Sequence, residues 1–197
     1  MQDTTPDPVF SRASLIGAAL FALAAGVLLW ARLPAPALAA ALYLCFAMAL
    51  ITLIDARHFI IPDVISLPSI PLGALATVMV FTPDDWGAGL TESAAGAGLA
   101  GGAFYLLRAF YFRLRGVEGL GLGDVKLAAV AGAWLGPQPL AMACLFAALG
   151  GLVAALFKRG RTGAGMPAGK AQIPFGSFIA PAILFFWLQK LWGIAPF

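Results

Sequence analysis

Long apolar stretches divide the chain into seven segments, which are separated by short runs of charged residues, proline and glycine. The segments cover residues 15–33, 37–54, 64–81, 86–111, 122–135, 140–157 and 175–194. An α-helix needs about 20 mostly apolar residues to cross a bilayer, and most of these segments approach that length. The pattern predicts an all-α, polytopic transmembrane helix bundle. It has seven helices, or six if the first segment lies on the membrane surface.

The fifth segment is shorter than the others and follows a glycine-rich turn. Gly119, Gly121 and Gly123 alternate there with other residues, and glycine permits unusual backbone angles and close approach of another chain. A short or broken span is tolerated where the backbone lines a polar cavity inside a membrane protein. We therefore expect this turn to open a short helix at the functional site.

The composition agrees with a membrane protein. Of the 197 residues, 61% are hydrophobic and 11% are charged, whereas an ordinary soluble domain has about 25% charged residues. We expect one membrane domain over residues 1–197, with a polar tail at 1–11 and a basic, glycine-rich cytoplasmic loop at 158–173. The lipid bilayer is the expected partner, and nucleic acid is not, because the net charge of +3 comes from loop cations that report topology.

The distribution of those cations predicts the orientation. If the N-terminus is inside, ten of the twelve Lys and Arg residues fall on the inner side. The positive-inside rule then places these loops in the cytoplasm. Asp55, at the end of the second segment, and Asp124, at the start of the fifth, would both face that side.

These two aspartates are the candidate catalytic residues. A carboxylate at the edge of a membrane segment is costly, which makes it a functional-site hypothesis. If the two meet, they cannot both ionise easily, so one acts as general base on water while the other donates a proton. Structural alternatives remain open: Asp124 as the N-cap of a helix that starts at Val125, and Asp55 as an interfacial partner of Arg57.

Three nearby residues are candidates for supporting roles. Asp63 follows Pro62 at the start of the third segment, where it suits a helix cap, and it is the second choice for the first catalytic carboxylate. Lys126 either lies near Asp124 and favours its ionised form or marks the membrane boundary. Glu118 orients the glycine turn, binds a cation or is a solvated loop residue.

Other chemistries lack their residues. Cys45 and Cys144 lie in apolar segments without a Cys-x-x-Cys pair, and the single His58 has no evident nucleophile partner. We expect no metal and no cofactor. The pairs Gly98/Gly102 and Gly132/Gly136 have the spacing of helix-packing contacts between membrane helices.

Three sequence blocks together resemble the type IV prepilin peptidases. They are Asp55-x6-Pro62-Asp63, the run from Glu118 to Leu127 (Glu-Gly-Leu-Gly-Leu-Gly-Asp-Val-Lys-Leu), and Ile173-Pro174-Phe175-Gly176. They occur in the family's order, and the resemblance extends over about residues 37–194. The Gly-x-Gly-Asp motif alone is less specific, because preflagellin peptidases and presenilin-like proteases share it.

The resemblance implies a polytopic aspartic endopeptidase of the bacterial inner membrane. Such an enzyme removes the short basic leader of prepilins or pseudopilins at the cytoplasmic face and needs no metal for cleavage. The family's two catalytic aspartates correspond to Asp55 and Asp124. Pro174, Phe175 and Gly176 are expected to shape the substrate groove.

One departure from the family pattern bears on activity. Many bacterial members carry an additional cytoplasmic domain with two zinc-binding Cys-x-x-Cys pairs, and they also methylate the new N-terminus. This chain has neither the cysteines nor the length, so we expect a short, peptidase-only form without zinc.

Two other function classes remain as alternatives. A proton-coupled transporter would need its acids near mid-span, whereas Asp55 and Asp124 lie at segment ends. A non-catalytic assembly component of a pilus or secretion apparatus would tolerate Asn at both positions. The oligomeric state does not follow from the sequence.

Overall fold

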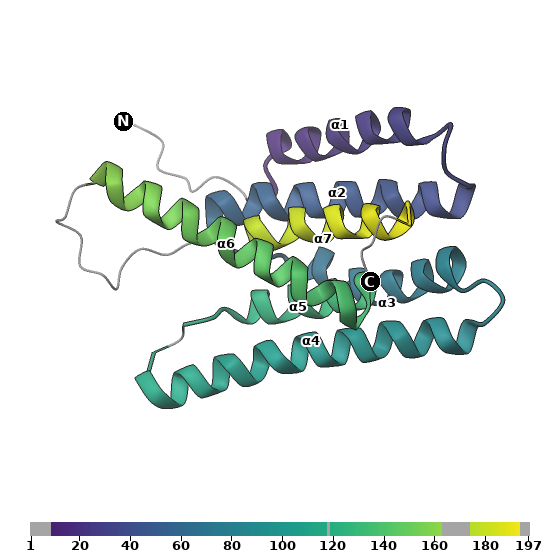
Figure 1. The fold of residues 1–197 in the computed structure, drawn as a ribbon. Helices are drawn as coiled ribbons and strands as arrows, with labels where there is room; N and C mark the ends of the chain where they lie inside the picture. Colours follow the sequence, from purple (N-terminus) through teal and green to yellow (C-terminus); the bar gives the residue numbers. More distant parts are fainter. Residues whose placement is uncertain (1–8, 118, 163–173, 194–197) are drawn as a thin grey trace.

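A computed structural model of the protein describes residues 9–117, 119–162 and 174–193. Within these residues it has seven α-helices and no β-strand. The helices are α1 (Arg12–Leu29), α2 (Ala35–His58), α3 (Asp63–Phe81), α4 (Trp86–Arg115), α5 (Leu122–Leu135), α6 (Pro137–Thr162) and α7 (Gly176–Leu191). Consecutive helices run in alternating directions (Figure 1). The all-α bundle and its short fifth helix are as predicted.

Four described helices are long and apolar enough to cross a membrane: α1, α2, α3 and the Pro137–Ala154 part of α6. Helix α4 has 30 residues but is less apolar, and α5 and α7 have 14 and 16. Large apolar side chains stay exposed on the outer helices, such as Val27 on α1 at 76% and Phe157 on α6 at 70%. The chain is therefore a polytopic membrane protein whose outer surface suits lipid.

Helix α5 lies inside the bundle, packed against α3, α4 and α7. Its Trp134 is buried, stacks on Tyr43 with ring centroids 5.9 Å apart, and meets Trp187 edge-on at 5.7 Å. The Trp134 indole N–H donates a hydrogen bond of 2.8 Å to the carbonyl of Ser69. A helix too short to cross alone is thus held by packing against its neighbours.

Glycines bring α4 and α5 into close contact. A Cβ on Gly96 would collide with the Gly132 carbonyl, and a Cβ on Gly132 would collide with the Gly96 carbonyl. The expected packing role of Gly132 is correct. For Gly98 and Gly102 the expectation is wrong, because nothing lies within 4 Å of a Cβ at either position. Spacing identified a glycine pattern on α4, but tertiary contacts use a different glycine.

Several helix boundaries differ from those predicted, and two of them bear on other expectations. Helix α6 continues to Thr162, so the first residues of the predicted loop at 158–173 are helical, and residues 163–173 lie outside the described part. Helix α2 continues to His58 and ends at Phe59, whose φ of 55° is left-handed. Asp55 therefore belongs to the last turn of α2.

Candidate functional site

Helices α2, α3, α5 and α7 bring their polar termini together at one end of the bundle, which we call the aspartate end. It comprises the last turn of α2 and the first turns of α3, α5 and α7. The end of α2 and the starts of α5 and α7 lie to the left in Figure 1. Asp55 comes from α2 and Asp124 from α5, so residues 69 positions apart in the sequence reach the same end of the fold.

Asp55 is almost fully buried, with 4% of its surface exposed. Its Oδ2 atom accepts a hydrogen bond of 2.7 Å from the backbone N–H of Ser177. The Ser177 hydroxyl also lies 3.0 Å from the same oxygen, and 3.2 Å from the carbonyl of Thr52. One residue of α7 thus supplies two donor groups to the Asp55 carboxylate.

The start of α7 explains this arrangement. The first N–H groups of a helix have no intrahelical acceptor, and the helix N-terminus favours negative charge. Ser177 is the second residue of α7, so its N–H is directed outward from the helix end. Asp55 accepts that N–H and lies where a carboxylate is electrostatically favoured.

Two glycines allow Ile61 to pack closely beside the aspartates. A Cβ on Gly176 would lie 2.9 Å from both Asp55 Oδ2 and Ile61 Cδ1. A Cβ on Gly123, the neighbour of Asp124, would lie 3.0 Å from Ile61 Cβ. The buried Ile61 side chain therefore contacts the surroundings of both aspartates.

Asp124 is half-buried and is the third residue of α5. The helix begins at Leu122 with Gly121 as its N-cap, so the structural alternative of Asp124 as the N-cap before Val125 is wrong. Its Oδ2 instead accepts the Gly121 N–H at 3.2 Å. Because glycine has no side chain, only this half of a capping box exists.

The two aspartates interact electrostatically. Asp124 lies on α5, which is not one of the four helices long enough to cross a membrane. Burial raises the pKa of Asp124 to about 6; the Gly121 N–H lowers it, and the negative charge of Asp55 raises it. With a pKa of about 6, Asp124 keeps its proton to a higher pH than an exposed aspartate does, because burial and the charge of Asp55 disfavour its ionised form.

Asp63 has a different environment. Lys126 Nζ lies 2.6 Å and 2.7 Å from its two carboxylate oxygens, and the Asp63 side chain is 55% exposed. The expected helix-cap role is wrong, because Pro62 is the N-cap of α3 and no side-chain cap bond forms there. The placement of Lys126 beside Asp124 is also corrected, since this lysine pairs with Asp63.

Neither Asp55 nor Asp124 pairs with a cation in the described part of the chain. The alternative of an Asp55–Arg57 pair is wrong, because Arg57 is directed to the Ser14 hydroxyl of α1 at 3.5 Å. Among the described residues, no three His, Cys, Asp or Glu side chains gather into a possible metal site.

The glycine-rich turn rests on the end of α4. The Arg108 Nε–H donates to the Leu120 carbonyl at 3.1 Å, and a Cβ on Gly119 would overlap the ring of Tyr111. Close approach therefore explains glycine at position 119. Glu118 lies outside the described residues, so its predicted role has no structural description.

The predicted groove residues also lie at the aspartate end. Phe175 precedes α7 and packs against Phe104, with ring centroids 6.2 Å apart, while Pro174 accepts the Ser177 N–H at 3.2 Å. Sequence reasoning missed Ser177 itself. Its signal was its position directly after Pro-Phe-Gly, at the start of the last predicted helix.

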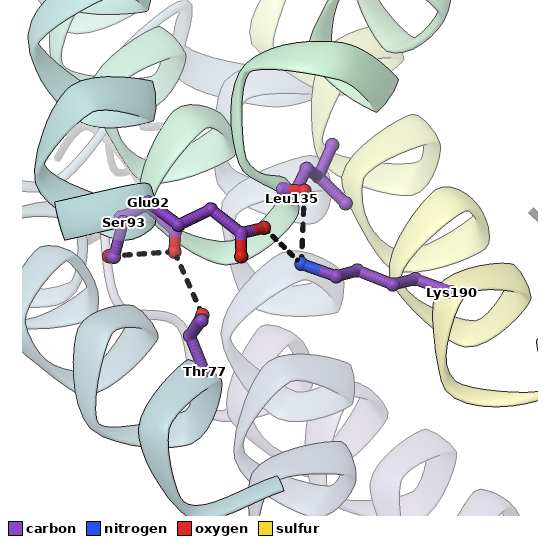
Figure 2. A network of polar contacts seen from close by, with 6 residues as sticks. Thr77, Glu92, Ser93, Leu135 and Lys190 are labelled. Carbon is purple, nitrogen blue, oxygen red and sulfur yellow. Dashed lines mark hydrogen bonds and ion pairs between the residues drawn. The ribbon is translucent and has the colours of Figure 1, made fainter. Parts of the chain in front are cut away.

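A second polar cluster lies at the opposite end of the bundle (Figure 2). Lys190 of α7 forms a 2.8 Å ion pair with Glu92 of α4 and donates to the Leu135 carbonyl at 3.3 Å. The Lys190 ammonium also lies 4.6 Å from the centre of the Phe81 ring. We call this group the Glu92–Lys190 cluster; Glu92 has a cation partner, unlike Asp55 and Asp124 among the described residues.

The fold and this site define a helical membrane protein with two carboxylates at one end of the bundle that have no cation partner in the described ranges. The profile of the Type IV leader peptidase family matches residues 42–156. The matched region contains both aspartates and the glycine turn. The chain belongs to the Type IV leader peptidase family.

Individual relatives agree with this assignment. A prepilin leader peptidase/N-methyltransferase of Burkholderia pseudomallei is 37% identical over 185 residues, covering 91% of this chain and 56% of the relative. Proteins of the same name from Pectobacterium carotovorum and Pseudomonas aeruginosa are 39% and 35% identical, covering 70% and 78% of this chain and 47% and 49% of theirs. The chain thus spans about half the length of these relatives. No solved structure matches it.

Proposed function

We propose that the protein is an aspartic endopeptidase of the bacterial inner membrane that removes the short basic leader of prepilins or pseudopilins. Cleavage takes place at the cytoplasmic face. Asp55 and Asp124 are the catalytic residues, and no metal takes part. Membership of the Type IV leader peptidase family supports the reaction class, and the names of the relatives support the substrate class.

One observation carries the proposal: two interacting carboxylates lie on different helices, and neither pairs with a cation among the residues that the structure describes. Buried charges that serve only stability are normally paired. A carboxylate pair sharing a proton provides a base and an acid at once.

The reaction follows general acid–base catalysis. The ionised carboxylate takes a proton from water, and the water oxygen bonds to the scissile carbonyl carbon. The protonated carboxylate then gives its proton to the amide nitrogen as the C–N bond breaks. One water is consumed, and the products are the leader and a mature chain with a free amino terminus.

Pro174, Phe175 and Gly176 form the nearest part of the substrate groove in this proposal. Gly176 has no side chain, so a peptide backbone can approach Asp55 where a Cβ would stand against its carboxylate. Gly121 and Gly123 support the other side by shaping the turn before Asp124. Asp63 and Lys126 act as a supporting ion pair.

The test is cleavage of a prepilin-like peptide by the purified full chain in detergent, followed by mass spectrometry. Wild type is compared with Asp55→Asn, Asp124→Asn and, as a matched control, Ser93→Ala at the opposite end of the bundle. A parallel wild-type sample contains a chelator. We expect wild type and the Ser93→Ala control to cleave the peptide at the leader junction, and we expect the two Asn variants not to cleave it. The chelator should not change cleavage by wild type.

The opposite results overturn the proposal. If a folded wild-type protein cleaves none of several leader peptides, the result would favour a proton-coupled transporter or a non-catalytic assembly component. Cleavage that survives Asp124→Asn would exclude the proposed site, and inhibition by chelator would exclude metal-free chemistry.

Orientation and methylation need separate measurements. The orientation is tested in a Cys45→Ala, Cys144→Ala background. A cysteine at Val117, between α4 and α5, should resist a membrane-impermeant maleimide applied to intact spheroplasts, while a cysteine at Asp84, between α3 and α4, should react.

Methylation is tested separately. Because these 197 residues contain no Cys-x-x-Cys pair, we expect them to transfer no methyl group from S-adenosylmethionine to the new N-terminus. A mass increase of the mature product would contradict that expectation.

A further inference from the structure

We propose that Ser177 is a positioning residue that keeps Asp55 as the ionised member of the aspartate pair, which makes Asp55 the general base and Asp124 the general acid. This inference rests on the proposed peptidase function, which treats both aspartates as catalytic but leaves their roles unassigned.

The two carboxylates differ in their hydrogen-bond donors. Asp55 Oδ2 accepts the Ser177 N–H at 2.7 Å and faces its hydroxyl at 3.0 Å. Asp124 Oδ2 accepts one N–H, from Gly121, at the longer distance of 3.2 Å. Donors directed at a carboxylate favour its charged form. The asymmetry therefore directs the negative charge to Asp55 and the shared proton to Asp124.

The helix that carries Ser177 also stabilises a negative charge on Asp55. Asp55 lies against the first turn of α7, where the unpaired N–H groups stabilise an anion. Gly176 keeps that turn close, because any side chain there would meet the Asp55 carboxylate. Asp124 also lies in the first turn of a helix, α5, so the difference between the two carboxylates comes from their donors: Asp124 accepts a single N–H at an exposed position.

Other ionisable groups near Asp55 do not reverse this assignment. On α2, Arg57 is directed to Ser14 of α1, and His58 follows it. On α3, Asp63 is neutralised by Lys126 of α5. Described residues 174–181 at the start of α7 contain no charged side chain.

At the first turn of α1, which packs against α2, the charged residue is Arg12. On α5, the charged group that interacts with Asp55 is Asp124, the other aspartate of the pair. Its pKa, raised to about 6, agrees with Asp124 as the member of the pair that holds a proton at mildly acidic pH.

The test compares Ser177→Thr with Ser177→Val, because the two side chains have the same shape and differ in the hydroxyl. Cleavage rates are measured from pH 5 to 9 with the full chain in detergent. We expect the acidic limb of the kcat profile to move to higher pH by roughly one unit in Ser177→Val, since one donor to the base is lost. Ser177→Thr should keep the wild-type limb, and KM should change little in both, because Ser177 contacts Asp55 rather than substrate.

The controls separate a positioning role from a structural one. Ser93→Ala removes another buried serine hydroxyl, which donates to the Ala133 carbonyl at 2.9 Å, and should leave the pH profile unchanged. If Ser177→Val does not fold, as judged by its melting temperature in detergent, Ser177→Ala against wild type gives the same comparison.

Superimposable profiles of the Thr and Val variants would overturn the role of Ser177. A shift of the alkaline limb alone would reverse the assignment and make Asp55 the acid. A folded wild type without cleavage at any pH would instead remove the proposed function, so the two failures are distinguishable.

Discussion

Glu92 at one end of the bundle has a cation partner, whereas Asp55 and Asp124 at the other end have none among the described residues. In the Glu92–Lys190 cluster, the carboxylate has a cation at 2.8 Å, and that cation also meets the Leu135 carbonyl and the Phe81 ring. At the aspartate end, Asp55 and Asp124 have hydrogen-bond donors but no cation among the described residues. Because a buried charge without a cation is costly, the environment of these aspartates supports the catalytic role proposed for them, whereas the Glu92–Lys190 pair links α4 to α7.

Helix α7 takes part in both ends. Ser177 contacts Asp55 near its start, and Lys190 contacts Glu92 near its end. These residues are 13 positions apart, about 20 Å along a helix. The Glu92–Lys190 cluster therefore fixes the far end of the helix whose near end holds Asp55. Substitutions at the two ends should separate activity from stability.

The largest effect should come from removing either aspartate. Asp55→Asn and Asp124→Asn keep the shape but cannot act as a base or exchange the required proton, so cleavage should fall by at least about a hundredfold. Peptide cleavage measures activity, and thermal unfolding in detergent should show an unchanged or higher melting temperature. A variant that loses activity only because it unfolds would contradict this prediction.

A smaller loss is expected when a methyl group enters the site. Gly176→Ala puts a Cβ 2.9 Å from the Asp55 carboxylate, so the carboxylate or Ile61 must move. Cleavage should fall roughly tenfold, since displacement of a catalytic group lowers the rate. Gly102→Ala is the matched control, because open space surrounds that position and alanine favours a helix. Equal activity of both variants would show that the narrow space at Gly176 has no catalytic importance.

At the opposite end, Lys190→Met should lower stability and spare chemistry. The variant leaves Glu92 without its cation, and because Glu92 is 37% exposed we expect a loss of about 1–2 kcal/mol. Thermal unfolding measures it, and cleavage at low temperature should stay near the wild-type rate. Adding Glu92→Gln should restore part of the stability. No recovery in the double variant would mean that Lys190 acts through packing and not through the ion pair.

The smallest effect is expected at the exposed ion pair. Asp63→Asn breaks a contact between side chains that are 55% and 32% exposed, and such pairs contribute about 0–1 kcal/mol. Cleavage should weaken by no more than a few-fold, far less than in Asp55→Asn. A loss at Asp63 equal to that at Asp55 would make the choice of the first catalytic aspartate wrong.

Much of the architecture was predictable from the lengths of the apolar segments and the residues that end them. The fifth segment was predicted at residues 122–135, which are the bounds of α5, because a glycine turn and a glycine–proline pair end the apolar run sharply. Boundaries were less accurate where a helix continues into polar sequence. Helix α2 runs on to His58 and α6 to Thr162, since backbone hydrogen bonds continue a helix beyond its apolar face.

The partners of individual side chains were not predictable in the same way. Spacing along the sequence predicted that Lys126 lies beside Asp124, two residues away. In the structure, Lys126 of α5 instead forms an ion pair with Asp63 of α3. The packing of Gly96 against Gly132 and the pairing of Glu92 with Lys190 also join distant helices. Such contacts depend on how helices rotate and approach each other, which spacing within one segment does not encode.

By itself, the sequence determined the membrane class, the helix order and the two candidate aspartates. Apolar length, cation distribution and the glycine-rich turn are local properties, so they can be read along the chain. Only the tertiary structure decided that Ser177 holds Asp55, that Ile61 lies beside Gly123 and Gly176, and that Lys126 neutralises Asp63. These contacts form only when the termini of α2, α3, α5 and α7 come together, and close packing across the whole bundle stabilises that arrangement.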